Sequence, residues 1–310
     1  MNIYISGSLA YDKIVEFPDK FQNHILSENL SNLNVSFMVE NSTIRLGGTA
    51  GNISYALKLL GGNPIILASL GKEDSKYIEW LHQNDISTKN IRMIENTATA
   101  TATIVTDNSQ NQITIFDPGA MNFPSLCNIT LIDQPLILWI GPGNLDDMSD
   151  YPKSARECNI PFIFDPGQSL PAWSEKNLLN TIEGSKLLIA NSYEMQMIEE
   201  KTNKTRDQLL NLTDLIIVTS GENGFTILSN NSSINFPAAS IQNVVDPTGA
   251  GDAFRGGLLK GIGDGKSIEE ACKIGAVCAA YCVQSHGTQE YSFTIEEFHA
   301  SFENYITNLK

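Results

Sequence analysis

The 310-residue chain contains no long apolar run and little positive charge. No stretch approaches the roughly 20 apolar residues that a transmembrane helix needs, although 42% of the residues are hydrophobic. Only 20 lysines and arginines stand against 35 aspartates and glutamates, which gives a formal net charge of −15. Because nucleic acids and anionic lipids attract basic patches, we expect neither a nucleic acid nor a membrane as a partner.

The sequence has no C-x-x-C pair, and we expect no targeting segment. The five cysteines include no C-x-x-C pair, and residues 1–6 have a strand-like pattern without the basic and apolar segments of a secretory signal. We therefore expect a cytoplasmic protein with reduced thiols. Cys278, Cys282 and His286 are four residues apart and would share one face of a continuous helix. A metal site there is conceivable, but a closely packed core helix is favoured.

Short apolar segments alternate with amphipathic ones along most of the chain. Strands are expected at residues 2–8, 64–70, 136–140, 161–164, 186–190, 215–219 and 225–228, and helices at 53–60, 74–84 and 250–261. This alternation predicts a doubly wound α/β fold with a mainly parallel sheet flanked by helices. Two β-rich insertions interrupt it: a strand pair at 35–39 and 43–46, and a hairpin formed by 97–106 and 112–116. We expect the insertions to form a small sheet at the edge or mouth of the large one.

The run Asp246-Pro247-Thr248-Gly249-Ala250-Gly251-Asp252 concentrates the most chemistry. It follows a short apolar segment and opens a helix, and a glycine-rich helix N-terminus is an anion site because its free N–H groups and the helix dipole favour negative charge. Asp252 beside that site could accept a proton or could cap the helix, and the run alone leaves both open. It lacks the lysine of a P-loop, so phosphate would have to be held differently.

Ligands of doubly wound folds bind outside the carboxyl ends of the strands. Polar residues that follow a strand or open a helix, and so could share one crevice, are Asp12, Asn52, Asp165, Gln168, Asn191, Glu194 and Asp252. Asn191 and Glu194 could hold a hydrated Mg²⁺, since Mg²⁺ prefers oxygen ligands and keeps several waters. They could equally form a capping box at the start of a helix.

Glycines and aromatic residues carry similar alternatives. Gly221 and Gly224, which follow Thr219, could admit phosphate oxygens or form a hairpin turn, and Gly47-Gly48 could touch a substrate or only make a tight turn. The apolar residues of the insertions are Phe37, Met38, Phe116 and Met121. They are favoured as core of the small sheet over ligand stacking, with Ser36 on the opposite side of its strand from Phe37.

Four motifs together resemble the ribokinase-like (PfkB) family of sugar and nucleoside kinases. In chain order they are Gly47-Gly48-x-x-x-Asn52, Asn191-x-x-Glu194, Thr219-x-Gly221-x-x-Gly224 and the run from Asp246 to Asp252. Within the family the chain is most similar to bacterial adenosine kinases, through Gly7-Ser8-x-x-x-Asp12, Phe17-Pro18, residues 33–39, Phe116-x-Pro118-Gly119-Ala120-Met121 and Gly287-Thr288-Gln289-Glu290. The resemblance spans nearly the whole chain.

The resemblance implies a ribokinase-like core of residues 1–11, 47–96 and 121–310 with a small β lid of residues 12–46 and 97–120. It also implies ATP-dependent phosphorylation of a ribose 5′-hydroxyl with Mg²⁺, often a monovalent cation such as K⁺, and in some members a homodimer. Asp252 would be the catalytic base, and the amides of Gly249, Ala250 and Gly251 would stabilise the transferring group.

The remaining roles follow from the same resemblance. Asp12 and Asn52 would bind the ribose hydroxyls, with Gly47 and Gly48 close to the sugar. Residues expected around the nucleobase or elsewhere on the substrate are Ser8, Ser36, Phe37, Phe116, Met121 and Gln168, with Arg255 reaching a phosphate. Residues expected at ATP and the metal ions are Asn191, Thr219, Gly221 and Gly224 for ATP, Asn191 and Glu194 for Mg²⁺ through water, and Asp246 and Thr248 for a monovalent cation.

Adenosine is the expected substrate. Phe37, Phe116 and Met121 suit a base better than a bare sugar, whereas Asp12 and Asn52 do not discriminate, because every riboside offers the same hydroxyls. A kinase for inosine, guanosine or free ribose is the alternative, and a non-catalytic nucleoside sensor is a more distant one.

Overall fold

A nine-stranded sheet forms the centre of the molecule. The computed structural model describes residues 2–25, 34–72, 75–109, 111–131, 137–240 and 243–309. The strand order is β13-β12-β11-β10-β9-β8-β1-β4-β5. The strands are β1 (Asn2–Ser6), β4 (Asn63–Gly71), β5 (Ile91–Ile94), β8 (Ile137–Ile140), β9 (Phe162–Phe164), β10 (Leu187–Asn191), β11 (Ile216–Thr219), β12 (Phe225–Ser229) and β13 (Ser232–Phe236). Neighbours are parallel except at β11–β12 and β12–β13, which confirms the predicted fold class.

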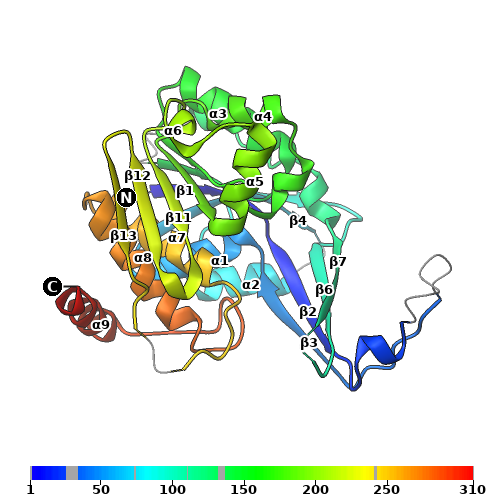
Figure 1. Ribbon diagram of the computed structural model, residues 1–310. Coiled ribbons are helices and arrows are strands. Elements are labelled where there is room, and N and C mark those ends of the chain that lie inside the picture. Colours follow the sequence, from blue (N-terminus) through cyan, green and yellow to red (C-terminus); the bar gives the residue numbers. More distant parts are fainter. Residues whose placement is uncertain are drawn as a thin grey trace.

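Helices cover both faces of this sheet (Figure 1). One layer consists of α3 (Leu145–Glu157), α4 (Glu175–Ile182), α5 (Ser192–Thr202) and α6 (Arg206–Leu209), and the other of α1 (Thr49–Leu59), α2 (Ser75–Gln83), α7 (Ala250–Gly263), α8 (Ile268–Cys282) and α9 (Ile295–Asn308). Side chains of a strand alternate between the faces, so Ile3 and Ile5 of β1 pack with α1 and α7 while Tyr4 packs with the α3 layer. A strand buried on both faces must be apolar throughout, which is why the sequence pattern revealed it.

A separate four-stranded sheet has the order β3-β2-β6-β7. Its strands are β2 (Ala10–Glu16), β3 (Asn41–Gly47), β6 (Ala100–Thr106) and β7 (Gln112–Asp117). Both predicted insertions contribute to it, and Figure 1 shows it projecting from one edge of the molecule. Ala10 and Gly47, predicted for the core domain, are paired residues of this sheet, and the domain boundaries themselves stay a prediction.

The predicted strand at residues 35–39 is wrong. That segment has no strand pairing, and the Phe37 ring instead packs on Phe17 and Phe21, with centroid distances of 4.8 and 5.4 Å. The partner of β3 is β2, which the sequence analysis missed together with β5 and β13. The expected first residues of two elements, Asp74 and Leu136, lie outside the described residues.

The cysteines of α8 belong to the core. Cys278 and Cys282 are fully buried, and burial raises the pKa of the Cys278 thiol to about 12. The helix ends at Cys282, so His286 does not continue its face, and the favoured interpretation as a closely packed core helix is confirmed for the two cysteines. Within the described ranges, no cluster of three His, Cys, Asp or Glu side chains could hold a metal ion. Every helix in those ranges is also too short or too polar to span a bilayer.

Candidate active site

The Asp246 carboxylate anchors the loop before α7 by two hydrogen bonds. Asp246 Oδ1 accepts a hydrogen bond from the Thr248 amide (2.9 Å), and its Oδ2 accepts one from the Gly287 amide (3.2 Å). Gly249 follows with φ +82° as the N-cap of α7, and a Cβ there would lie 2.7 Å from Thr288 Cγ2. Only glycine fits this backbone and this space. Among the first-turn amides that follow, that of Ala250 lies 3.3 Å from Pro247 O, whereas those of Gly251 and Asp252 have no backbone acceptor among the described residues, as an anion site requires.

Asp252 does not cap the helix. No side-chain capping bond is made at the start of α7, and Asp252 Oδ2 instead accepts a hydrogen bond from Asn52 Nδ2 (2.7 Å). Burial raises the pKa of Asp252 to about 6; Arg255 and the Asn52 bond oppose this rise, and Asp165 and Asp12 add to it. The carboxylate is therefore poised to bind and release a proton near neutral pH.

Asn52 links α1 to the segment after α8. It is 5% exposed, and its Oδ1 accepts hydrogen bonds from Thr288 Oγ1 (2.8 Å) and Gln289 Nε2 (2.7 Å). Its amide oxygen is thus engaged within the protein. Its NH₂ group faces Asp252 and keeps a second hydrogen for a ligand.

Asp12 reaches the same region from the small sheet. Burial, together with the charge of Asp246, raises the pKa of Asp12 to about 6. A Cβ on Gly47 would lie 2.5 Å from Asp12 Oδ2, so glycine is needed for the carboxylate to sit there. Asp12 pairs with Ala102, and Ala102 with Phe116, so all three share one sheet face. Phe116 is 46% exposed on that face, in the same row as Asp12.

Arg255 forms a bidentate ion pair with Asp165. Arg255 Nε lies 2.6 Å from Asp165 Oδ2 and Nη2 lies 3.0 Å from Oδ1, with both side chains buried. The third nitrogen, Nη1, lies 2.8 Å from where a Cβ of Gly251 would stand, beside the start of α7. The guanidinium thus lies beside the predicted anion site, and its predicted contact with phosphate stays a prediction.

Asn191 and Glu194 form the capping box that was one of the two readings of their spacing. Asn191 Oδ1 accepts from the Glu194 amide and Glu194 Oε2 accepts from the Asn191 amide, both at 2.8 Å. Burial raises the pKa of Glu194, as does the nearby Asp165, while Arg255 lowers it. Glu194 therefore lies close enough to the Arg255–Asp165 pair to feel both charges, and a role toward Mg²⁺ stays a prediction.

A cavity of 440 Å³ adjoins the start of α7. It brings together the predicted Thr219, Gly221 and Gly224 with Ala250 and Gly251. Apart from Glu222, the remaining lining residues are small or apolar, among them Val244, Ala276, Ala279, Ala280 and Val283. Asn191 does not line it. A flat apolar ring with a phosphate tail pointing toward α7 would match this lining.

Five predicted substrate residues lie in other surroundings. Ser8 Oγ accepts from the Thr49 amide (3.0 Å) and so anchors α1, and Gln168 is exposed. Ser36 is exposed, and Phe37 belongs to the ring cluster beyond the end of β2, five residues or roughly 17 Å along the strand from Asp12. Met121 is half-buried in a turn, where its carbonyl accepts from Asn144 Nδ2.

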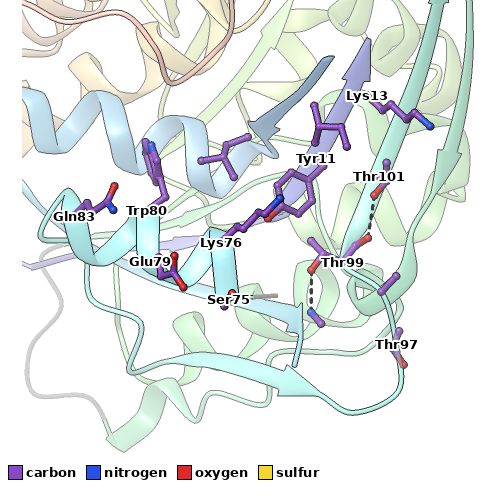
Figure 2. A pocket seen from close by; sticks show the side chains of 14 residues that line it. Tyr11, Lys13, Ser75, Lys76, Glu79, Trp80, Gln83, Thr97, Thr99 and Thr101 are labelled. Carbon is purple, nitrogen blue, oxygen red and sulfur yellow. Dashed lines mark hydrogen bonds between the residues drawn. The ribbon is translucent and has the colours of Figure 1, made fainter. Parts of the chain in front are cut away.

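Figure 2 shows a second cavity, of 740 Å³, between the small sheet and α2. Tyr11 and Lys13 line it, and because they flank Asp12 in β2 they point to the sheet face opposite to Asp12. Trp80 and Glu79 of α2 form the other side. This cavity is therefore separated from the candidate active site by the small sheet itself.

Sequence reasoning missed three residues of the site. Thr288 and Gln289 were part of a motif to which the sequence analysis gave no role, and Tyr77 was predicted only as part of a helix. The structure brings Tyr77 to this site, since Tyr77 Oη lies 3.2 Å from Gln289 Nε2. Asp165 was placed in the crevice, but its pairing with Arg255 was not foreseen. The motif Gly287-Thr288-Gln289-Glu290 was the one available signal.

The comparisons agree with this geometry. Residues 25–295 match the family described as pfkB family carbohydrate kinase. The chain is 32% identical over 258 residues to a nucleoside kinase of Methanocaldococcus jannaschii, covering 83% of this chain and 85% of the relative. A nucleoside kinase of Burkholderia thailandensis in complex with inosine superimposes with a TM-score of 0.89 at 35% identity, covering 98% of both chains. A ribokinase of Thermotoga maritima, at 22% identity and a TM-score of 0.81 over 97% of this chain and 99% of that one, shares the fold. The chain therefore belongs to the pfkB family of carbohydrate kinases, phosphotransferases with an alcohol group as acceptor.

Proposed function

We propose that the protein transfers the γ-phosphate of ATP to the 5′-hydroxyl of adenosine. The observation that carries this proposal is the position of Asp252, a carboxylate with a pKa raised to about 6 at the N-terminus of α7, directly beside the cavity lined by Gly221, Gly224 and Gly251. Relatives named as nucleoside kinases, one of them solved with inosine, support a nucleoside as acceptor.

Asp252 acts as the general base in this proposal. As the 5′-oxygen attacks the γ-phosphorus, its proton passes to the Asp252 carboxylate, the new O–P bond forms, and the bond to the β-phosphate oxygen breaks to release ADP. The first-turn amides of α7 stabilise the negative charge on the transferring group, because they are fixed in place before the reaction. AMP and ADP are the products.

The nucleoside is held from two sides. Asp12 of β2 accepts hydrogen bonds from the ribose hydroxyls, and the free hydrogen of Asn52 Nδ2 donates to one of them. Phe116, exposed in the row of Asp12, offers its ring to the base. Closure of the small sheet over the crevice excludes water that would otherwise hydrolyse ATP.

Magnesium fits the donors present only through water and phosphate. Asn191 and Glu194 already bond to each other's amides, and the described residues offer no three-carboxylate cage. A site with few carboxylates suits Mg²⁺, because this ion keeps several waters and is usually bound by one or two carboxylates together with the phosphates of the substrate. Glu194 would orient one of those waters. Asp246 and Thr248 are the proposed surroundings of a monovalent cation.

A substrate panel tests the proposal. ADP release is measured with adenosine, inosine, guanosine, cytidine, ribose and fructose, and adenosine should give the highest kcat/KM. Inosine is the second candidate, because the Burkholderia relative binds it. Preference for a free sugar would refute a nucleoside acceptor, and tight nucleoside binding without any turnover would indicate a sensor.

A further inference from the structure

A chain of hydrogen bonds runs from a backbone carbonyl to the candidate base. It begins at the Gly47 carbonyl and passes through Tyr77, Gln289 and Asn52 to Asp252. We infer that Gln289 is a positioning residue that fixes the orientation of the Asn52 amide, so that its NH₂ group and not its oxygen faces Asp252. The inference rests on the proposed role of Asp252 and deepens it.

The donor and acceptor of every hydrogen bond in this chain follow from the bond between Tyr77 and the Gly47 carbonyl. A carbonyl oxygen can only accept, so the Tyr77 hydroxyl donates to Gly47 O (2.7 Å). Having used its single hydrogen, Tyr77 Oη can only accept from Gln289, which places the Gln289 NH₂ group toward it (3.2 Å). The same Nε2 is 2.7 Å from Asn52, so the Asn52 atom that faces it must be Oδ1. Nδ2 is then left for Asp252 Oδ2 at 2.7 Å.

Thr288 cannot fix this orientation. Its hydroxyl lies 2.8 Å from Asn52 Oδ1 and 3.0 Å from Leu46 O. It can donate to Asn52, or it can donate to Leu46 O and accept from an Asn52 amide turned by 180°. Both orientations of Asn52 satisfy Thr288, so the choice between them depends on Gln289.

Two features of the hydrogen-bond chain around Gln289 lower the stability of the protein. Gln289 Oε1 is buried and has no hydrogen-bond partner among the described residues, so half of the Gln289 amide is unsatisfied, which costs stability. Gly51 stands inside α1, where glycine is unfavourable. A Cβ there would lie 2.0 Å from Tyr77 Oη and 2.9 Å from Gln289 Nε2. Both features are consistent with Gln289 being needed at this position for its NH₂ group, which donates to Asn52 Oδ1.

The consequence concerns the proton affinity of Asp252. With Asn52 turned, two oxygens would face each other, and the carboxylate would be ionised only at higher pH. The charged or titratable groups around Asp252 are Arg255 on its own helix, Asp165 after β9, Asp12 of β2 and Cys282 of α8. None of them changes in Gln289→Leu, which adds no charge, so a difference in titration between this variant and the wild type reports on Asn52.

The test is a titration of Asp252 by NMR of protein labelled with ¹³C at the aspartate carboxyl carbon. The signal of Asp252 is identified by its absence in Asp252→Asn. In Gln289→Leu, which removes the donor, the midpoint should move up by about one pH unit. Gln289→Glu, which keeps the size and loses the donor on ionisation, should move it in the same direction, with the added charge contributing to the shift, so Gln289→Leu is the variant that decides.

Tyr55→Phe is the matched control. Tyr55 also donates a buried hydroxyl to a backbone carbonyl, Tyr291 O at 2.6 Å, but lies outside the chain of bonds. Its loss should lower the thermal stability and leave the midpoint of Asp252 and the kcat unchanged.

An unchanged midpoint in folded Gln289→Leu would overturn the inference, and so would unfolding of both Gln289 variants, because the residue would then be structural. The titration needs no substrate, so it judges the inference even if adenosine is not phosphorylated. Where an acceptor is found, the acidic limb of kcat should move with the midpoint and the KM for ATP should stay the same.

Discussion

The buried Asp252 carboxylate should lower the free energy of unfolding, and Asp252→Asn should raise it again. Burial, net of the attraction of Arg255, raises its pKa from 3.8 to about 6, which corresponds to roughly 3 kcal/mol of preference for the neutral form in the folded state. At pH 8 the wild-type carboxylate is ionised in both the folded and the unfolded state, so folding bears this penalty. Asparagine is similar in size and never ionised. The variant should therefore be more stable at pH 8, by up to roughly 3 kcal/mol.

The pH dependence of the stability difference between Asp252→Asn and the wild type shows whether ionisation of Asp252 causes it. The folded protein binds the proton more tightly than the unfolded chain, so wild-type stability rises, relative to the variant, as the pH falls from about 6 toward 4. Below about pH 4 the carboxyl is protonated in both states and the penalty is gone. Urea unfolding at pH 8 and at the lowest pH where the protein stays folded measures both values. Asp207→Asn, a change at an exposed carboxylate of α6, is the control and should stay within about 0.5 kcal/mol of wild type. A variant less stable than wild type at pH 8 would refute the reasoning.

Three further outcomes follow from the site. The kcat should fall about tenfold per pH unit below a pH near 6, because protonated Asp252 cannot accept the 5′-hydroxyl proton; a flat profile down to pH 5 would contradict this. Asp165→Asn should lower the free energy of unfolding by about 3 kcal/mol in urea titrations, since it leaves Arg255 buried with one charge partner fewer, and an unchanged value would count against the pair. Gly47→Ala should lower kcat/KM for adenosine by about 10²-fold by displacing Asp12, with the KM for ATP unchanged; equal effects on both substrates would point to general misfolding.

The sequence predicted the large sheet and the loop of Asp252 because both depend on local patterns. Strands such as β8 and β10 are buried on both faces and must be apolar throughout. The glycines at the start of α7 are demanded by a positive φ at Gly249 and by close packing on Thr288. Such signals lie within a few residues of each other.

The small sheet was harder to predict because burial does not mark its strands. β2 is half-buried along most of its length, so it shows no clear alternation. The same holds for β13, which is an edge strand of the large sheet with mostly exposed residues. The alternating residues 35–39 did suggest a strand. Their Phe37 packs on Phe17 and Phe21 instead, a contact between rings that strand propensity does not describe.

The network behind Asp252 could not be predicted, because its members are far apart in sequence. Asn52 meets Asp252 across 200 residues and Gln289 across 237. Asp165 and Arg255 meet across 90. The motifs placed Asp252, Asn52 and Asp12 in one crevice, but which atom of Asn52 faces the carboxylate depends on packing around Tyr77.

The most direct test of the account is the rate of AMP formation from adenosine and ATP by Asp252→Asn, with adenosine binding measured by calorimetry on the same protein. If Asp252 is the base, the rate should fall by about 10²–10⁴-fold or more while adenosine still binds. Turnover close to that of the wild type would contradict the central claim.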